Sequence, residues 1–165
     1  MLHTEQQRRI IEEYENASDQ EVLDFVNDVL LGKNQLSYVT IAFIPEKASE
    51  QIFELTGKKV VGNRVVLDRN AIRHIENRHG TNGKHDQSMK SISDVARMGY
   101  VIRNYDSIRY DGLTTTAHPD ENGNPSPMVS FSKRIDGTYY VIETVNEVKS
   151  KRNYVVTAYI ESAKE

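Results

Sequence analysis

The chain has 165 residues, of which 38% are hydrophobic and 27% are charged, and it contains no cysteine. This composition indicates a folded globular protein of about one domain, and it excludes disulfides, thiolate metal sites and cysteine nucleophiles. The net charge of −3 is unevenly distributed, because residues 1–32 carry eight acidic and two basic side chains whereas residues 33–165 carry sixteen acidic and nineteen basic ones. The mildly basic body is compatible with a polyanionic partner but does not predict one.

The sequence contains no apolar run of membrane-spanning length. Its first residues also lack the basic and apolar regions of a signal peptide. We therefore expect no membrane partner and a cytoplasmic location.

Residues 1–32 are expected to form an acidic helical hairpin appended to an α+β domain of residues 33–165. Ser18 and Glu21 match a capping box, in which each side chain satisfies a free backbone donor of the other residue. The apolar residues that follow repeat at helical spacing up to Gly32, a residue suited to end a helix. A weaker apolar pattern upstream indicates a second helix that pairs with the first.

The middle of the chain alternates between short strands and helices. β-branched and aromatic residues indicate the strands, and Pro, Asp and Gly mark the helix ends. The expected elements are a strand at residues 38–44, a helix from Pro45 to Gly57, a short strand at residues 65–67, a helix that Asp68 caps and Gly80 ends, and a short helix from Ser91 to Gly99.

The remainder of the chain is typical of antiparallel strands. The expected strands lie at residues 100–110, 128–135, 138–147 and 153–161, with a long polar loop at residues 111–127. The dipeptide Asp136-Gly137 predicts a two-residue hairpin turn, which pairs Lys133 with Tyr140 and Glu143 with Ser130. N-terminal helices followed by a mostly antiparallel sheet predict an α+β fold.

Two histidines lie on the predicted helix before Gly80. His74 and His79 are five residues apart and point about 140° away from each other, so they cannot chelate one metal ion together. His74 and Arg78 are four apart and share a face, which suits a phosphate, although a merely solvated basic face is equally compatible. His79 can also stabilise the helix end through its charge. We expect no metal and no cofactor, and no role for the other histidines, His3, His85 and His118.

The last strand offers hydroxyl groups on one face. Strict alternation places Val155, Thr157 and Tyr159 together, with Val156 among the residues of the opposite, core face. Thr157 and Tyr159 are candidates for substrate contact, although such residues also occur simply as good sheet formers. Lys133 on the preceding hairpin supplies a nearby cation. Glu143 is either a structural residue, which we favour, or a candidate general base.

The order of these segments resembles the phage-associated Barnase–EndoU–Colicin–RelE-like nuclease domains over residues 37–161. The resemblance rests on these segments: Leu55-Thr56-Gly57, Arg73-His74-Ile75, Arg78-His79-Gly80, Ser93-Asp94, Tyr105-Asp106, Ser132-Lys133, Gly137-Thr138-Tyr139-Tyr140 and Val156-Thr157-Ala158-Tyr159. The loop after Asp111 and the acidic hairpin at residues 1–32 lie outside the family's pattern.

The resemblance implies a metal-independent RNA endonuclease of the toxin or phage-effector type, which acts through attack of the ribose 2′-hydroxyl on the adjacent phosphorus. It implies an acid or base role for His74, a complementary or orienting role for His79, stabilisation of the phosphorane charge by Arg78 and Lys133, and contacts from Thr157 and Tyr159 to the phosphate oxygens. It also implies RNA as substrate, with tRNA as one candidate, an immunity or host protein as partner, and delivery by a phage or a secretion system as part of a larger protein.

Three other functions are compatible with the sequence. The first is a catalytically inactive nuclease-like binding module that inhibits a host protein, for which the acidic hairpin would serve as the binding surface. The second is a transferase acting on a nucleotide cofactor, against which the lack of a Gly-rich phosphate loop counts. The third is a phage structural component.

Overall fold

The computed structural model of the protein describes residues 4–15, 18–33, 36–114, 118–147 and 149–162. The helices are α1 (Glu5–Glu15), α2 (Gln20–Leu30), α3 (Glu46–Thr56), α4 (Arg69–His79), α5 (Ile92–Ala96) and α6 (Met98–Arg103). The strands are β1 (Tyr38–Phe43), β2 (Arg64–Asp68), β3 (Ser107–Leu113), β4 (Pro127–Arg134), β5 (Thr138–Thr144) and β6 (Arg152–Glu161). Within these residues, no helix has the length and apolar character that crossing a membrane requires.

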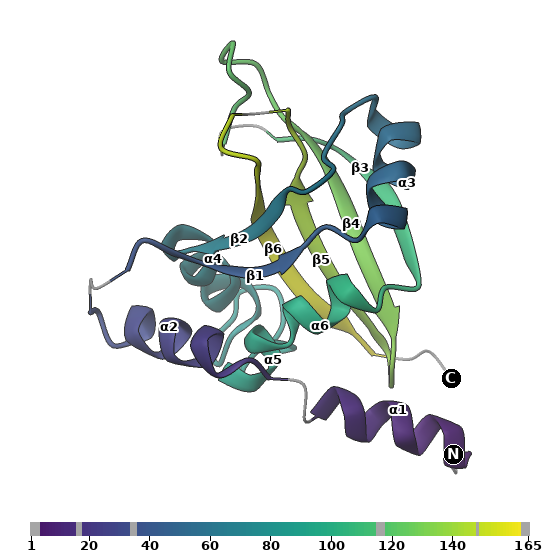
Figure 1. Cartoon of the computed structure of the whole chain (residues 1–165). Helices are drawn as coiled ribbons and strands as arrows, with labels where there is room; N and C mark the ends of the chain where they lie inside the picture. The colour runs from purple at the N-terminus through teal and green to yellow at the C-terminus, as the bar shows by residue number, and fades with distance from the viewer. Residues whose placement is uncertain (1–3, 16–17, 34–35, 115–117, 148, 163–165) are drawn as a thin grey trace.

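The strands form one sheet in the order β1-β2-β6-β5-β4-β3. All neighbouring pairs are antiparallel except β2 and β6, which run parallel. The sheet is strongly bent, so β1 and β2 cross in front of the longer strands (Figure 1). This architecture confirms the predicted α+β fold with a mostly antiparallel sheet.

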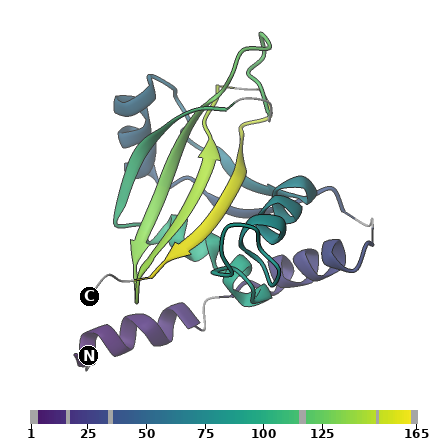
Figure 2. The ribbon, with the colours of Figure 1, turned by 180° about the vertical axis from the view of Figure 1, so that it is seen from behind.

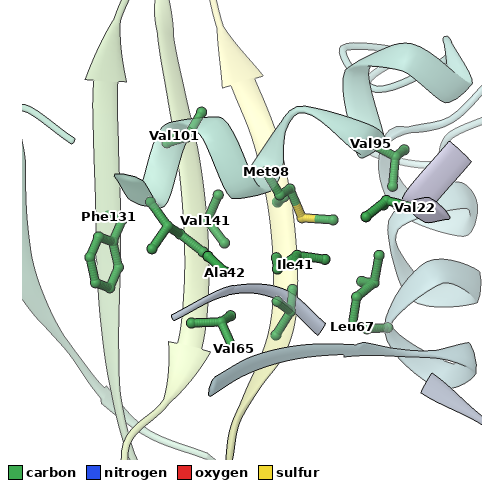
Figure 3. Close-up of a cluster of buried hydrophobic side chains, with 14 of the residues drawn as sticks. Val22, Ile41, Ala42, Val65, Leu67, Val95, Met98, Val101, Phe131 and Val141 are labelled. Atoms are coloured by element: carbon green, nitrogen blue, oxygen red, sulfur yellow. The ribbon is translucent and has the colours of Figure 1, made fainter. Parts of the chain in front are cut away.

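One hydrophobic core fills the bend of the sheet. Ile41 and Val65 of the short strands meet Phe131 and Val141 of the long strands there, and Met98 of α6 closes the layer (Figure 3). All five of these residues are buried. The side of β3–β6 that faces this core is called the covered face below.

The opposite side of β3–β6 is crossed by no described helix (Figure 2). Cross-strand pairing shows which residues share this open face, because directly paired residues project to the same side of a sheet. Its residues are Ser107, Arg109, Ser130, Ser132, Tyr140, Ile142, Thr157 and Tyr159. Helix α4 stands beside β6 at one edge of the open face (Figure 2).

The hairpin between β4 and β5 differs from the prediction by one residue. Lys133 pairs with Tyr139, and Glu143 pairs with Val129. The turn has three residues instead of two, because the Ile135 amide bonds to the Gly137 carbonyl and Gly137 adopts a φ of 118°. A shift of one residue moves every side chain of a strand to the other face. Lys133 and Glu143 therefore both project to the covered face.

The last strand contains a bulge at Val155 and Val156. Ile142 pairs with Thr157, whereas the next residue, Glu143, pairs with Val155, so Val156 is the extra residue. The predicted faces of Thr157 and Tyr159 relative to Ala158 are correct. The predicted open-face position of Val155 is wrong, because the bulge pairs Val155 with Glu143 and buries it.

Residues 98–103 form a helix, where the sequence suggested the start of a strand and a helix end at Gly99. Val101 and Ile102 are β-branched, but packing in the core outweighs their strand preference. Gly99 lies inside α6 and does not end the helix. A glycine is required at this position because a Cβ atom there would lie 2.3 Å from the Ile41 carbonyl oxygen. Its small size lets α6 approach β1.

The two N-terminal helices contact different parts of the body. Tyr14 of α1 packs edge-on against Tyr100 and Tyr139, and α2 packs against α5, β1 and α4. Asp19, and not Ser18, accepts the first free amides of α2. The division of the chain at residue 32 stays a prediction, although α2 buries Val22 and other residues in the shared core.

Candidate active site

Helix α4 is fixed at both ends by the residues that its sequence predicted. The Asp68 carboxylate accepts a hydrogen bond from the Ala71 amide at 2.8 Å, which caps the N-terminus. The Gly80 amide donates to the Glu76 carbonyl and closes the last turn. Ile72 and Ile75 anchor the helix in the core, so His74 and Arg78 are held on its exposed side.

His74 lines a cavity of about 420 Å³ between α4, the sheet and the loop that follows β3. The α4 side contributes Asp68 and His74, the sheet contributes Met128 and Val156, and the loop contributes His118. The cavity thus brings two imidazoles and a carboxylate together against a mostly apolar wall. Such a mixture is typical of small-molecule and catalytic sites.

The position of His74 favours its neutral form. Burial, followed by the neighbouring charges of Arg78 and His79, lowers the pKa of His74 from its ordinary value of 6.5. A neutral imidazole at neutral pH can accept a proton. His74 is therefore suited to act as a general base in this cavity.

His118 is held on the other side of the cavity by two contacts. Its Nε2 lies 3.1 Å from Oδ2 of Asp68, and its ring stacks on Tyr154 with the centroids 3.9 Å apart and the planes within 6°. Although burial acts in the opposite direction, hydrogen bonds from His118 and from the Ala71 and Asn70 amides lower the pKa of Asp68. Asp68 is thus an ionised carboxylate that joins the α4 N-terminus to the loop.

His79 is buried beneath the surface, with 5% of its area exposed. Its Nδ1 lies 3.0 Å from Oδ1 of Asp86, and its ring stacks on Tyr159 at a centroid distance of 5.3 Å. Although burial raises the pKa of Asp86, hydrogen bonds from Ser88 and His79 lower it overall. This geometry suits His79 to hold Tyr159 in place, and it leaves little access for a substrate.

Tyr159 and Thr157 lie on the open face next to α4. Burial, and then the negative charge of Glu161, raise the pKa of Tyr159, so its hydroxyl stays protonated and can donate a hydrogen bond. The Thr157 hydroxyl is enclosed and has no hydrogen-bond partner among the described residues. The fold therefore gains nothing from this hydroxyl group.

The structure does not bring Lys133 to this site. Its Nζ lies 3.7 Å from Oδ1 of Asp106 on the covered face, whereas Thr157 and Tyr159 lie on the open face. The predicted two-residue turn would have paired Lys133 with Tyr140, which shares a face with Tyr159, whereas the three-residue turn places Lys133 on the other face. The role of Lys133 toward the phosphorane charge therefore stays a prediction of the resemblance.

Glu143 also lies away from the cavity, with none of its surface exposed. Neither carboxyl oxygen has a hydrogen-bond partner among the described residues, and burial raises the pKa of Glu143 well above its ordinary value of 4.5. The carboxyl group is thus protonated inside the core, which agrees with a structural role rather than with a base that meets substrate.

Two further features of the described residues bear on the choice of site. A larger cavity of about 860 Å³ lies between α3 and the β5–β6 connection, but its described lining contains no histidine. No group of three or more His, Cys, Asp or Glu side chains within the described ranges is arranged to hold a metal ion. His3 lies outside these ranges, and His85 is an exposed residue edge-on to His79.

Sequence reasoning missed the place of His118. The residue sits in a long polar loop, 50 positions after Asp68 in the chain, and no local spacing links the two. The one available signal was Asp68 itself, which the sequence identified only as a helix cap. A capping carboxylate has a second oxygen, and here that oxygen holds the imidazole.

A comparison with known families matches most of the chain. The phage-Barnase-EndoU-ColicinE5/D-RelE like nuclease family model covers residues 42–165, which include α4, the long loop and all the strands from β2 onward. Comparisons with curated proteins and with solved structures gave no match. On the strength of the family match over most of its length, the chain belongs to the phage-Barnase-EndoU-ColicinE5/D-RelE like nucleases.

Proposed function

We propose that the protein is an endoribonuclease that cleaves RNA by internal transphosphorylation and needs no metal ion. The family match supports nuclease activity in general. The proposal of RNA cleavage by internal transphosphorylation rests on the position of His74, a histidine with a lowered pKa that lines a cavity at the edge of the open face.

In the proposed reaction, His74 takes the proton from a ribose 2′-hydroxyl. The oxygen attacks the adjacent phosphorus and forms a 2′,3′-cyclic phosphate, while the bond from phosphorus to the 5′ oxygen breaks and that oxygen receives a proton. Histidine suits the first step because its ordinary pKa is about 6.5, and a lowered value increases its neutral fraction near neutral pH.

Arg78 is the proposed partner of the developing negative charge. It lies one helical turn after His74 on the exposed side of α4, close enough for its charge to lower the pKa of His74. A guanidinium group offers several fixed donors to phosphate oxygens, and such stabilisation is a large contribution to catalysis.

Tyr159 and Thr157 supply the remaining contacts in this proposal. The Tyr159 hydroxyl donates a hydrogen bond to a phosphate oxygen, and His79 acts as the positioning residue that holds the ring. Thr157 gains a partner when RNA binds, since one rotation about its Cα–Cβ bond redirects the hydroxyl. The exposed Arg109 lies on the same open face, where it offers a further cation to the RNA.

Cleavage of total RNA in the presence of EDTA tests the proposal. The wild-type protein should cut RNA, leave cyclic phosphate ends and spare DNA, which lacks the attacking hydroxyl. His74→Ala should slow cleavage at least about a hundredfold, the usual scale for loss of a general acid or base. His85→Ala is the matched control, because His85 is an exposed histidine that does not line the cavity.

Two results would contradict the proposal. One is a folded His74→Ala variant with full activity, which would remove His74 from the reaction. The other is a protein that leaves RNA intact under all conditions but binds a host protein tightly, which would favour the inhibitory binding module.

A further inference from the structure

We propose that His118 is the general acid of the reaction and that Asp68 and Tyr154 hold it in position. This inference rests on the proposed function and adds the group that it lacks, because the departing 5′ oxygen needs a proton donor. His79 is poorly placed for that role, since it is buried and its Nδ1 faces Asp86.

The contacts of His118 leave one ring nitrogen for the substrate. Nε2 faces Asp68 at 3.1 Å, and Nδ1 has no hydrogen-bond partner among the described residues. When the ring is protonated, the Nε2–H group and Asp68 form an ion pair, and the Nδ1–H group is left to donate. Asp68 thereby orients the ring, in the way that a carboxylate orients a catalytic histidine in hydrolase triads.

The ring of His118 is also held against rotation. Its face lies flat on Tyr154, with the centroids 3.9 Å apart, and the carbonyl oxygen of its own backbone accepts a hydrogen bond from the Ser126 hydroxyl. Such fixed orientation is what a proton donor needs to meet a leaving oxygen within hydrogen-bond distance.

The backbone at His118 is strained. Its φ is +47°, and among the described residues only Lys151 shares a positive φ without being glycine. A backbone of this kind costs about 1–3 kcal/mol and persists only where surrounding contacts hold it, often at a functional site. The contacts with Asp68, Tyr154 and Ser126 keep the backbone of His118 in this conformation.

His74 and His118 face the cavity from different elements. His74 projects from α4, six residues after Asp68 and about 9 Å further along the helix axis. His118 comes from the loop beside Asp68. A phosphodiester bound in this cavity would thus meet a base on one side and an acid on the other, as attack and departure on opposite sides of phosphorus require.

A substrate that needs no proton on its leaving group tests this assignment. The probe is an RNA oligomer with sulfur in place of the bridging 5′ oxygen at the mapped cleavage site, compared with the unmodified oligomer. A thiolate leaves without help from an acid. His118→Ala should slow cleavage of the unmodified RNA at least about a hundredfold and leave the sulfur-bridged RNA within a few-fold of wild type.

Two companion variants separate the roles. Asp68→Asn keeps a good helix cap but loses the carboxylate charge, so it should show the same selective loss, restored by the sulfur bridge. His74→Ala should be slow on both substrates, because both need the base. The assignment of His118 would be overturned if His118→Ala were equally slow on the unmodified and the sulfur-bridged RNA, or fully active on both. In either case, cleavage by the wild-type protein would still support the proposed function. A wild-type protein that cuts neither RNA would refute both.

Discussion

Thr157→Val separates the stability of the fold from the activity of the proposed site. The Thr157 hydroxyl is enclosed without a partner among the described residues. An unsatisfied buried polar group costs about 1–3 kcal/mol, and valine has nearly the same shape without the hydroxyl. The variant should therefore unfold at higher denaturant concentration, with a gain of about 1–2 kcal/mol in the free energy of unfolding, equivalent to a rise in Tm of roughly 2–8 °C.

The same substitution should weaken catalysis. If the hydroxyl binds a phosphate oxygen in the transition state, its loss removes a hydrogen bond to a charged group, worth about 1.5–3 kcal/mol, and slows cleavage by roughly ten- to a hundredfold. Stability is measured by urea unfolding, and activity is measured as kcat/KM on a labelled RNA oligomer.

Thr144→Val is the matched control on the neighbouring strand. The Thr144 hydroxyl accepts a hydrogen bond from the Tyr154 amide at 3.1 Å, so its removal should destabilise the protein by about 1–3 kcal/mol. A Thr157→Val variant that is less stable than wild type would show that the hydroxyl has a partner in the fold. A variant with unchanged kcat/KM would remove Thr157 from the proposed site.

Three further predictions concern Glu143, Arg78 and Lys133. Because burial raises the folded-state pKa of Glu143 well above 4.5, the folded protein retains a proton that the unfolded chain loses between these two pKa values. The free energy of unfolding should then fall by about 1.4 kcal/mol per unit as the pH rises through that window, as measured by urea unfolding. Glu143→Gln should remove this slope. Equal slopes in the variant and in the wild type would contradict a buried carboxyl group. Arg78→Ala should move the acidic limb of the kcat/KM profile to higher pH, because it removes a charge that lowers the pKa of His74, and an unmoved limb would separate the two residues. Lys133→Ala should change cleavage by less than about threefold, or roughly 0.6 kcal/mol, because Lys133 lies on the covered face, and a large loss in a folded variant would contradict this placement.

The parts of the site that depend on local signals were predictable from the sequence. The bounds of α4 were predictable from its cap residue Asp68, its apolar spacing and Gly80 at its end. The same spacing places His74 and Arg78 on the exposed side of the helix. The alternation around Ala158 likewise assigned Thr157 and Tyr159 to the same face.

The parts that depend on turn length and long-range contact were not predictable. A single extra residue in the turn at Gly137 moved Lys133 to the opposite face, because register in a sheet has a period of two. The bulge at Val156 had the same effect on its neighbours. His118 reaches Asp68 only through a long-range contact of the loop between β3 and β4, and neither the composition of that loop nor its spacing indicates this contact.

In the proposed reaction, a ribose 2′-hydroxyl attacks the phosphorus in the cavity that His74 lines at the edge of the open face. The most direct measurement uses an RNA oligomer in which the single nucleotide on the 5′ side of the mapped cleavage site carries a 2′-deoxyribose. The wild-type protein should leave this linkage intact while it cuts the all-ribose oligomer to a cyclic phosphate. Cleavage of the deoxy linkage at a comparable rate would rule out attack by the 2′-hydroxyl, because another nucleophile would then attack the phosphorus.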